Sequence, residues 1–165
     1  MTDSIQQYQT KYTVRFLANL GSGKDGRVVK TKSRSAVKFI YDESVYRREL
    51  RAYQVLRQLD IEEVNGFQIP GLIRFDDAFR SIEMSIVKPP FLLDFAASYT
   101  RLEYERFEFT QEVLDERESY WSDIFGPRWP IVRTTCDLFT RETGLILLDL
   151  SLNNIKFEDQ GINTL

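Results

Sequence analysis

The sequence contains no histidine and only one cysteine, Cys136, among its 165 residues. A single thiol cannot close an internal disulfide, and the missing imidazole excludes histidine-dependent mechanisms and zinc sites. The chain also has no apolar run long enough to span a bilayer, and its polar beginning, Met1 to Lys11, lacks the apolar centre of a secretory signal. We therefore expect a cytoplasmic protein that does not associate with membranes.

Concentrated positive charge is absent as well. The chain carries 22 Lys and Arg against 25 Asp and Glu, spread along its length, for a net charge of -3. Nucleic-acid binding needs a concentrated basic surface, so we expect no nucleic-acid partner. The composition, 42% hydrophobic and 13% aromatic, is that of a folded protein with one domain or two small lobes that share a cleft.

The first half of the chain has the pattern of an antiparallel sheet with one helix. Residues 12–41 are rich in β-branched and aromatic residues and are interrupted by glycines, which predicts three strands, to about residue 20 and over 27–31 and 35–41. Helical spacing then follows the capping candidates Asp42 and Ser44 as far as about Leu59. Two further strands are predicted at 72–75 and 81–87, around a turn at Asp76 and Asp77.

The second half of the chain is predicted to be mostly helical. Adjacent prolines, Pro89 and Pro90, stiffen the backbone and remove two hydrogen-bond donors, which marks a boundary. After it we expect helices at 92–99, 109–124 and 130–143, the last ended by Gly144. An apolar run at 145–148 then leads into Asp149 and Asn154.

A glycine-rich turn lies between the first two predicted strands. Gly21, Gly23, Gly26 and Val28 fit the pattern G-x-G-x-x-G-x-V. Glycines let a backbone approach phosphate oxygens closely, and Val28 would cover a nucleotide base. The strand-like residues after Gly26 argue against a dinucleotide-binding turn, and Asp25 stands where a P-loop needs Ser or Thr. Alone, the motif fits a plain glycine-rich hairpin about as well as a phosphate loop.

A lysine and a glutamate give this turn its context. Strand alternation places Ala36 and Lys38 on one face of their strand, and Glu49 falls on the inward stripe of the following helix. A buried carboxylate needs a partner, and Lys38 is the obvious one, although Arg47, Arg48 or Arg51 could instead pair with Glu49 at the surface. A lysine that pairs with a helix carboxylate while contacting phosphate is an arrangement used for phosphoryl transfer.

Asp149 and Asn154 match the pattern D-x-x-x-x-N after an apolar segment. In phosphoryl transfer such an aspartate accepts the substrate proton, and the asparagine holds a metal ion. This spacing is common by chance, so its value comes from its place after the glycine turn, the strand lysine and the helix glutamate.

With these residues in this order, the chain resembles the protein-kinase-like superfamily over roughly residues 20–157. The resemblance implies an α+β fold, with a five-stranded antiparallel N-lobe sheet and one helix over residues 1–88 and a reduced, mostly helical C-lobe over 89–165. It also implies that ATP and magnesium are cofactors. Lys38 and Glu49 would position the phosphates, Asp149 would act as base, and Asn154 would be a metal ligand.

The resemblance further suggests where the nucleotide base lies. Residues 81–88 look like the strand and hinge that hold adenine, with Met84 in the gatekeeper-like place, and residues 92–95 look like the start of the helix after the hinge. Backbone groups for the base would come from Ile86, Val87 and Lys88. The side chains that would sandwich the base are those of Leu20, Val28 and Ala36.

The chain departs from the family pattern around Asp149. Leu147 and Leu148 stand where the family usually has His-Arg, and Ser151 stands where it often has a lysine that neutralises the moving phosphoryl group. The family's next hairpin would be made by strands at 154–157 and 162–165 around a turn at 158–161, and its metal-binding aspartate, in Asp-Phe-Gly, would fall just beyond Leu165. Asp159 begins a similar triplet, but it lies too close to Asn154 for two short strands and a turn, so we interpret it as a turn residue.

Two functional hypotheses follow. The first is an ATP-binding, kinase-like phosphotransferase, and the second is a catalytically inactive pseudokinase that acts as a binding or regulatory module. A structural protein without a ligand is a third interpretation. A reduced C-lobe would expose apolar surface at 145–148 and on the preceding helices, which a second copy or another protein could cover.

Overall fold

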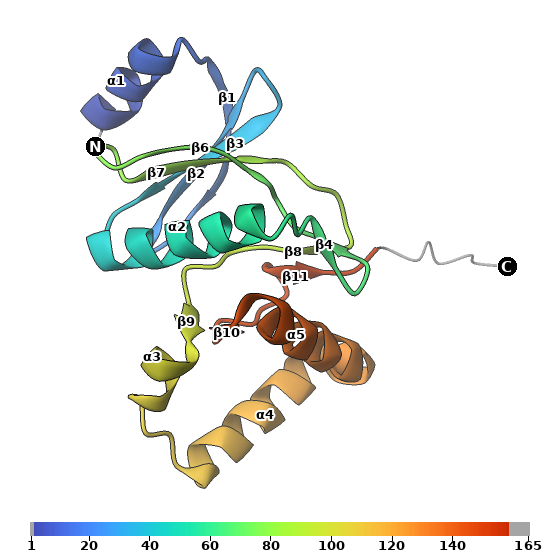
Figure 1. Ribbon diagram of the computed structural model, residues 1–165. Helices are drawn as coiled ribbons and strands as arrows, with labels where there is room; N and C mark the ends of the chain where they lie inside the picture. The colour runs from blue at the N-terminus through green and yellow to red at the C-terminus, as the bar shows by residue number, and fades with distance from the viewer. Residues whose placement is uncertain (1, 159–165) are drawn as a thin grey trace, which may run out of the picture.

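The computed structural model describes residues 2–158 of the chain and leaves residues 1 and 159–165 undescribed. A twisted sheet lies at one end of the molecule, and a group of helices lies at the other (Figure 1). The fold is of the α+β class, as predicted. The apparent triplet that begins at Asp159, and the strand expected at 162–165, lie outside the described residues.

The sheet has five strands, and each strand is antiparallel to its neighbours. In spatial order they are β1 (Phe16–Ser22), β2 (Gly26–Thr31), β3 (Ser35–Ile40), β7 (Ser81–Ser85) and β6 (Leu72–Asp76). This is the predicted sheet, with bounds that differ from the expected ones by a few residues. Its central strand, β3, is buried along its whole length.

One face of the sheet is covered by helix α1 (Thr2–Tyr12), which the sequence analysis did not anticipate. Tyr8 of this helix is buried in a small cluster with Val29, Val37 and Phe39. Its hydroxyl donates a hydrogen bond to Glu83 Oε2 at 3.0 Å. The polar composition of α1 conceals Tyr8, the buried aromatic side chain that packs the helix against the sheet.

Helix α2 (Glu43–Gln58) covers the other face and begins where the capping signal predicts. The carboxylate of Asp42 accepts hydrogen bonds from the backbone N–H groups of Ser44 and Val45, which satisfies two free donors of the first turn. The helix buries a stripe at helical spacing, and this stripe includes Tyr46, Glu49 and Tyr53.

Short strands connect the sheet to the helical part. β4 (Glu63–Val64), β5 (Phe67–Gln68), β8 (Phe91–Leu92) and β11 (Ile155–Lys156) form a second sheet in the order β11-β8-β5-β4. A separate two-stranded pair joins β9 (Ser98–Thr100) to β10 (Leu145–Leu147). β11 lies within the segment 154–157 that was expected to be a strand, whereas the other five short strands, each of two or three residues, were not predicted.

The helix predicted at 92–99 is wrong, and so is the interpretation of residues 92–95 as a helix start. Leu92 pairs with Ile155 in one ladder, and Ser98 pairs with Leu147 in another. Between them Asp94 has a φ of +64°, which a right-handed helix does not allow. The apolar residues of this segment are buried through pairing with a distant part of the chain, which outweighs their helix-like spacing.

The helical part consists of α3 (Arg101–Glu105), α4 (Gln111–Phe125), the 3-10 turn η1 (Gly126–Arg128) and α5 (Trp129–Thr143). α5 ends at Gly144 in a left-handed conformation, as predicted. The expectation of exposed apolar surface at 145–148 is wrong for Leu145 and Leu147, because both are buried within the chain. No helix among residues 2–158 is long and apolar enough to cross a membrane.

Candidate functional site

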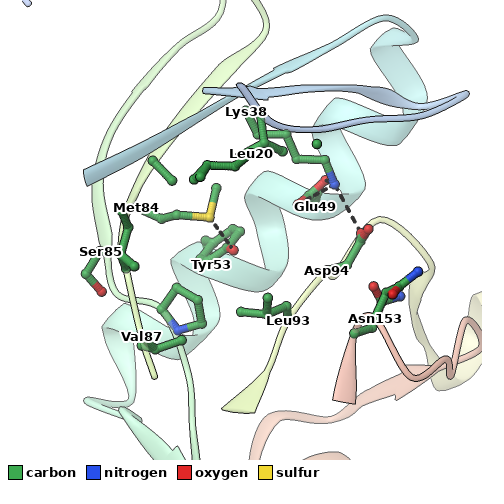
Figure 2. A pocket seen from close by; sticks show the side chains of 16 residues that line it. Leu20, Lys38, Glu49, Tyr53, Met84, Ser85, Val87, Leu93, Asp94 and Asn153 are labelled. Carbon is green, nitrogen blue, oxygen red and sulfur yellow. Dashed lines mark hydrogen bonds and ion pairs between the residues drawn. The ribbon is translucent and has the colours of Figure 1, made fainter. Parts of the chain in front are cut away.

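A cleft of about 310 Å³ lies between the sheet, α2 and the segments around residues 93–94 and 153–154. Figure 2 shows Lys38 and Leu20 above it, Met84 and Val87 toward one end, and Asp94 and Asn153 toward the other. Most of the residues predicted to bind the nucleotide line this cleft. They are Leu20, Gly21, Val28, Ala36, Lys38, Met84 and Val87.

A second cavity of about 580 Å³ adjoins the first beneath the glycine turn, and Gly23 and Gly26 line it. A Cβ built on Gly26 would clash with the carbonyl oxygen of Phe39, so β2 and β3 can approach this closely only with glycine there. A Cβ on Gly23 meets nothing within 4 Å. Gly26 therefore holds the turn against the sheet, while Gly23 faces open space.

Lys38 is the central charged group of the cleft. Its Nζ lies 3.0 Å from Oε1 and 2.8 Å from Oε2 of Glu49, and 3.1 Å from Oδ1 of Asp94. The Lys38 and Glu49 side chains are 9% and 1% exposed, whereas Asp94 is 33% exposed toward the cleft. Strand β3 and helix α2 thus hold a buried ion pair whose cation also reaches a third, more accessible carboxylate.

The surface alternative for Glu49 is not formed. Arg47 pairs with Glu43 and Asp77, and Arg51 pairs with Glu103. Arg48 Nε donates to the backbone oxygen of Ala96 at 2.6 Å. All three alternative arginines therefore have other partners, which leaves Glu49 to Lys38.

Burial and neighbouring charges have opposite effects on the pKa of each member of this pair. Burial raises the pKa of Glu49 to about 7, although the attraction of Lys38 works against this increase. Burial also opposes the charge on Lys38, but the carboxylates of Glu49 and Asp94 outweigh it, so the pKa of Lys38 lies above its ordinary value. Lys38 therefore remains a cation at neutral pH.

The opposite end of the cleft is apolar and bounded by strand β7. Met84 pairs with Ala36 across the sheet, and the hydroxyl of Tyr53 donates to Met84 Sδ at 2.9 Å. Ile86 and Val87 line the cleft beyond the end of the strand, but Lys88 does not. The backbone N–H of Lys88 instead lies 3.4 Å from Gln68 Oε1, so the structure does not bring this predicted residue into the cleft.

The loop of residues 148–154 carries the last two predicted residues. Asn154 lines the cleft, and its Nδ2 donates to the backbone oxygen of Asp149 at 3.2 Å. Asp149 itself is exposed and does not line the cleft. Asn154 thus ties the two ends of the loop together, with Asp149 at the surface beside the cleft.

Among the cleft residues that were not predicted from the sequence are Asp94 and Asn153. The signal for Asp94 is an Asp-Phe pair directly after the apolar run that follows Pro90. Its predicted location in a helix concealed this signal.

No group of three or more His, Cys, Asp or Glu side chains in the described part of the chain could hold a metal ion.

The sheet order, helix α2 on one face of the sheet and the buried Lys38–Glu49 pair beside a glycine turn are those of a protein-kinase-like fold. Solved structures of aminoglycoside phosphotransferases are similar to this chain. One is the streptomycin-ATP-APH(2")-IIa ternary complex, with 18% identity and a TM-score of 0.45 over 72% of this chain and 35% of that one.

Two further structures match to a similar degree. ADP-bound APH(2'')-Ib has 19% identity and a TM-score of 0.44, over 70% of this chain and 34% of that one. The gentamicin-APH(2")-IIa complex has 19% identity and a TM-score of 0.44, over 72% and 34%. The match thus spans about a third of the length of these enzymes. No family model and no curated protein matches the sequence.

Proposed function

We propose that this protein binds ATP with magnesium in the cleft and transfers the terminal phosphoryl group to an acceptor hydroxyl. The observation that carries the proposal is the buried Lys38–Glu49 pair, whose cation faces a cleft that is apolar at one end and lies beside glycines at the other. A buried ion pair contributes little net stability, so its position on the wall of a cleft favours a functional role.

Each part of a nucleotide has a matching surface. The base would lie between Leu20, Val28 and Ala36, with Met84 behind it. The phosphates would lie beneath the glycine turn, where Lys38 can contact them while Glu49 fixes its side chain. Magnesium would neutralise phosphate charge, and the amide oxygen of Asn154 is suited to hold it.

Asp149 would accept the proton of the acceptor hydroxyl. As the hydroxyl oxygen forms its bond to the terminal phosphorus, the bond between that phosphorus and the bridging oxygen breaks, and ADP leaves with the electron pair. The exposure of Asp149 leaves it accessible to an acceptor from solvent, and Asn154 holds its backbone in place.

The test of nucleotide binding is calorimetry with ATP and magnesium. We expect Lys38→Met to weaken binding at least 30-fold, which corresponds to about 2 kcal/mol, because the variant loses a charge-assisted contact to phosphate. The matched control is Lys32→Ala, an exposed lysine outside the cleft, which should bind like the wild type. No binding by the wild type at millimolar ATP, with magnesium or manganese, would refute the proposal.

The second candidate is a pseudokinase that binds nucleotide without turnover. It is favoured by the position of Asp149 outside the cleft lining and by Ser151, which replaces a cation. Transfer of labelled phosphate from ATP to any acceptor, and its loss in Asp149→Asn, would exclude the pseudokinase. Nucleotide binding without such transfer across a panel of acceptors would favour it.

A further inference from the structure

Two segments that are distant in the sequence run antiparallel on the floor of the cleft. β8 pairs with β11, and β9 pairs with β10. Between these ladders the N–H of Leu93 donates to the oxygen of Asn154 at 2.7 Å, and the N–H of Leu148 donates to the oxygen of Ala97 at 3.0 Å. The bend at 93–97 is therefore held directly against loop 148–154.

Asp94 is at the centre of this bend, with one oxygen bound and the other available. Its Oδ1 accepts from Lys38 Nζ and from the backbone N–H of Ala96, each at 3.1 Å. Its Oδ2 makes no hydrogen bond to any described residue. Figure 2 shows the carboxylate turned toward Lys38 at the end of the cleft near Asn153.

The conformation of Asp94 has a cost. A φ of +64° in a non-glycine residue costs on the order of 1 kcal/mol or more. Lys38 already has Glu49 as a partner, at shorter distances than Asp94. A strained bend that brings a partly exposed carboxylate to an existing ion pair is better explained by a ligand of that carboxylate.

Asn154 provides a second free oxygen at the same place. Its Nδ2 is occupied by the backbone oxygen of Asp149, and its Oδ1 has no hydrogen bond within residues 2–158. Asp94 and Asn154 line the same cleft, and the hydrogen bond from Leu93 to Asn154 couples their backbones. A carboxylate and an amide oxygen are donors that Mg²⁺ and Mn²⁺ accept, with phosphate and water oxygens completing the shell.

We propose that Asp94 and Asn154 together hold the divalent cation that accompanies the nucleotide phosphates. The inference rests on the proposed nucleotide binding and assigns its metal site. It also changes the expected chain order, because the resemblance would have put the metal-binding carboxylate after the 148–154 loop, beyond Leu165. In this chain the proposed carboxylate, Asp94, precedes helices α3 to α5 in the sequence. The pairing of β8 with β11 and of β9 with β10 brings loop 148–154 beside it.

The experiment is a Mn²⁺ titration followed by electron paramagnetic resonance, in the presence of a non-hydrolysable ATP analogue. We expect Asp94→Asn to weaken Mn²⁺ binding at least tenfold. The amide can still accept a hydrogen bond from Lys38, so thermal unfolding should show a folded protein. Asn154→Ala should weaken Mn²⁺ binding in the same way. The control Asp123→Asn removes an exposed carboxylate on α4, with the same change of charge, and should leave the affinity unaltered.

The outcomes separate this inference from the proposed function. If the wild type binds the analogue with Mn²⁺, and both Asp94→Asn and Asn154→Ala bind Mn²⁺ within twofold of it, the metal assignment is wrong while nucleotide binding stands. If the wild type does not bind the analogue with or without metal, the nucleotide proposal and the metal assignment fail together. A tenfold loss of Mn²⁺ affinity in both variants, with the Asp123→Asn control unchanged, supports the assignment.

Discussion

At the scale of single residues, Glu49 is the most constrained group of the site. It is 1% exposed, and its only cationic partner among the described residues is Lys38. Taking a carboxylate out of water is costly, and the raised pKa of about 7 expresses that cost. The ammonium group of Lys38 pairs with Glu49 in the interior and also lines the cleft.

The raised pKa of Glu49 predicts that this residue makes the free energy of unfolding depend on pH. Between its ordinary value of 4.5 and about 7, the folded state keeps a proton that the unfolded state has released, so the free energy of unfolding falls as the pH rises. The contribution is at most about 1.4 kcal/mol per pH unit. Glu49→Gln cannot titrate, so wild-type stability relative to this variant should decline from about pH 5 to 7 and level off above.

Urea denaturation of both proteins at several pH values measures this difference. Parallel stability curves for the wild type and Glu49→Gln across pH 5 to 8 would show that the pKa of Glu49 is not raised in the folded state.

At the scale of elements, predictions succeeded where the pattern is local. The five strands of the main sheet and helix α2 follow from alternation, turn residues and a capping aspartate within each segment. The pair of Lys38 with Glu49 could be predicted because each lies on the inward face of its own element. The strand at 91–92 and the bend at Asp94 could not, because both depend on pairing with residues 147–156.

The turn between β1 and β2 offers a test of element geometry. Gly26→Ala should destabilise the protein by roughly 1–3 kcal/mol, because the added Cβ would clash with the Phe39 carbonyl and separate β2 from β3. Gly23→Ala is the matched control in the same turn, where a Cβ meets nothing, and should change stability by no more than about 0.5 kcal/mol. Equal effects of the two substitutions, measured by urea denaturation, would contradict the close approach at Gly26.

At the scale of the whole molecule, one hydrophobic core joins the sheet to the helices. The rings of Tyr53 and Phe95 meet edge to face at 5.2 Å, and those of Phe95 and Phe139 stack at 5.6 Å. All three side chains are at most 1% exposed. Because Phe95 directly follows Asp94, the packing that joins α2 to α5 also anchors the bend that carries the proposed metal ligand.

This continuity predicts that the two parts unfold together. Phe139→Ala should lower the free energy of unfolding by about 3–5 kcal/mol, since it leaves a cavity against Phe95 at the centre of the core. Phe107→Ala, at a ring that is 43% exposed, should cost far less. In both variants Trp121 and Trp129 fluorescence should report the same transition as far-ultraviolet circular dichroism, which follows the backbone of the entire chain. If the tryptophan signal moves to lower denaturant in Phe139→Ala while the circular dichroism of the sheet persists, the helical part unfolds independently, and the site is held by two separate units.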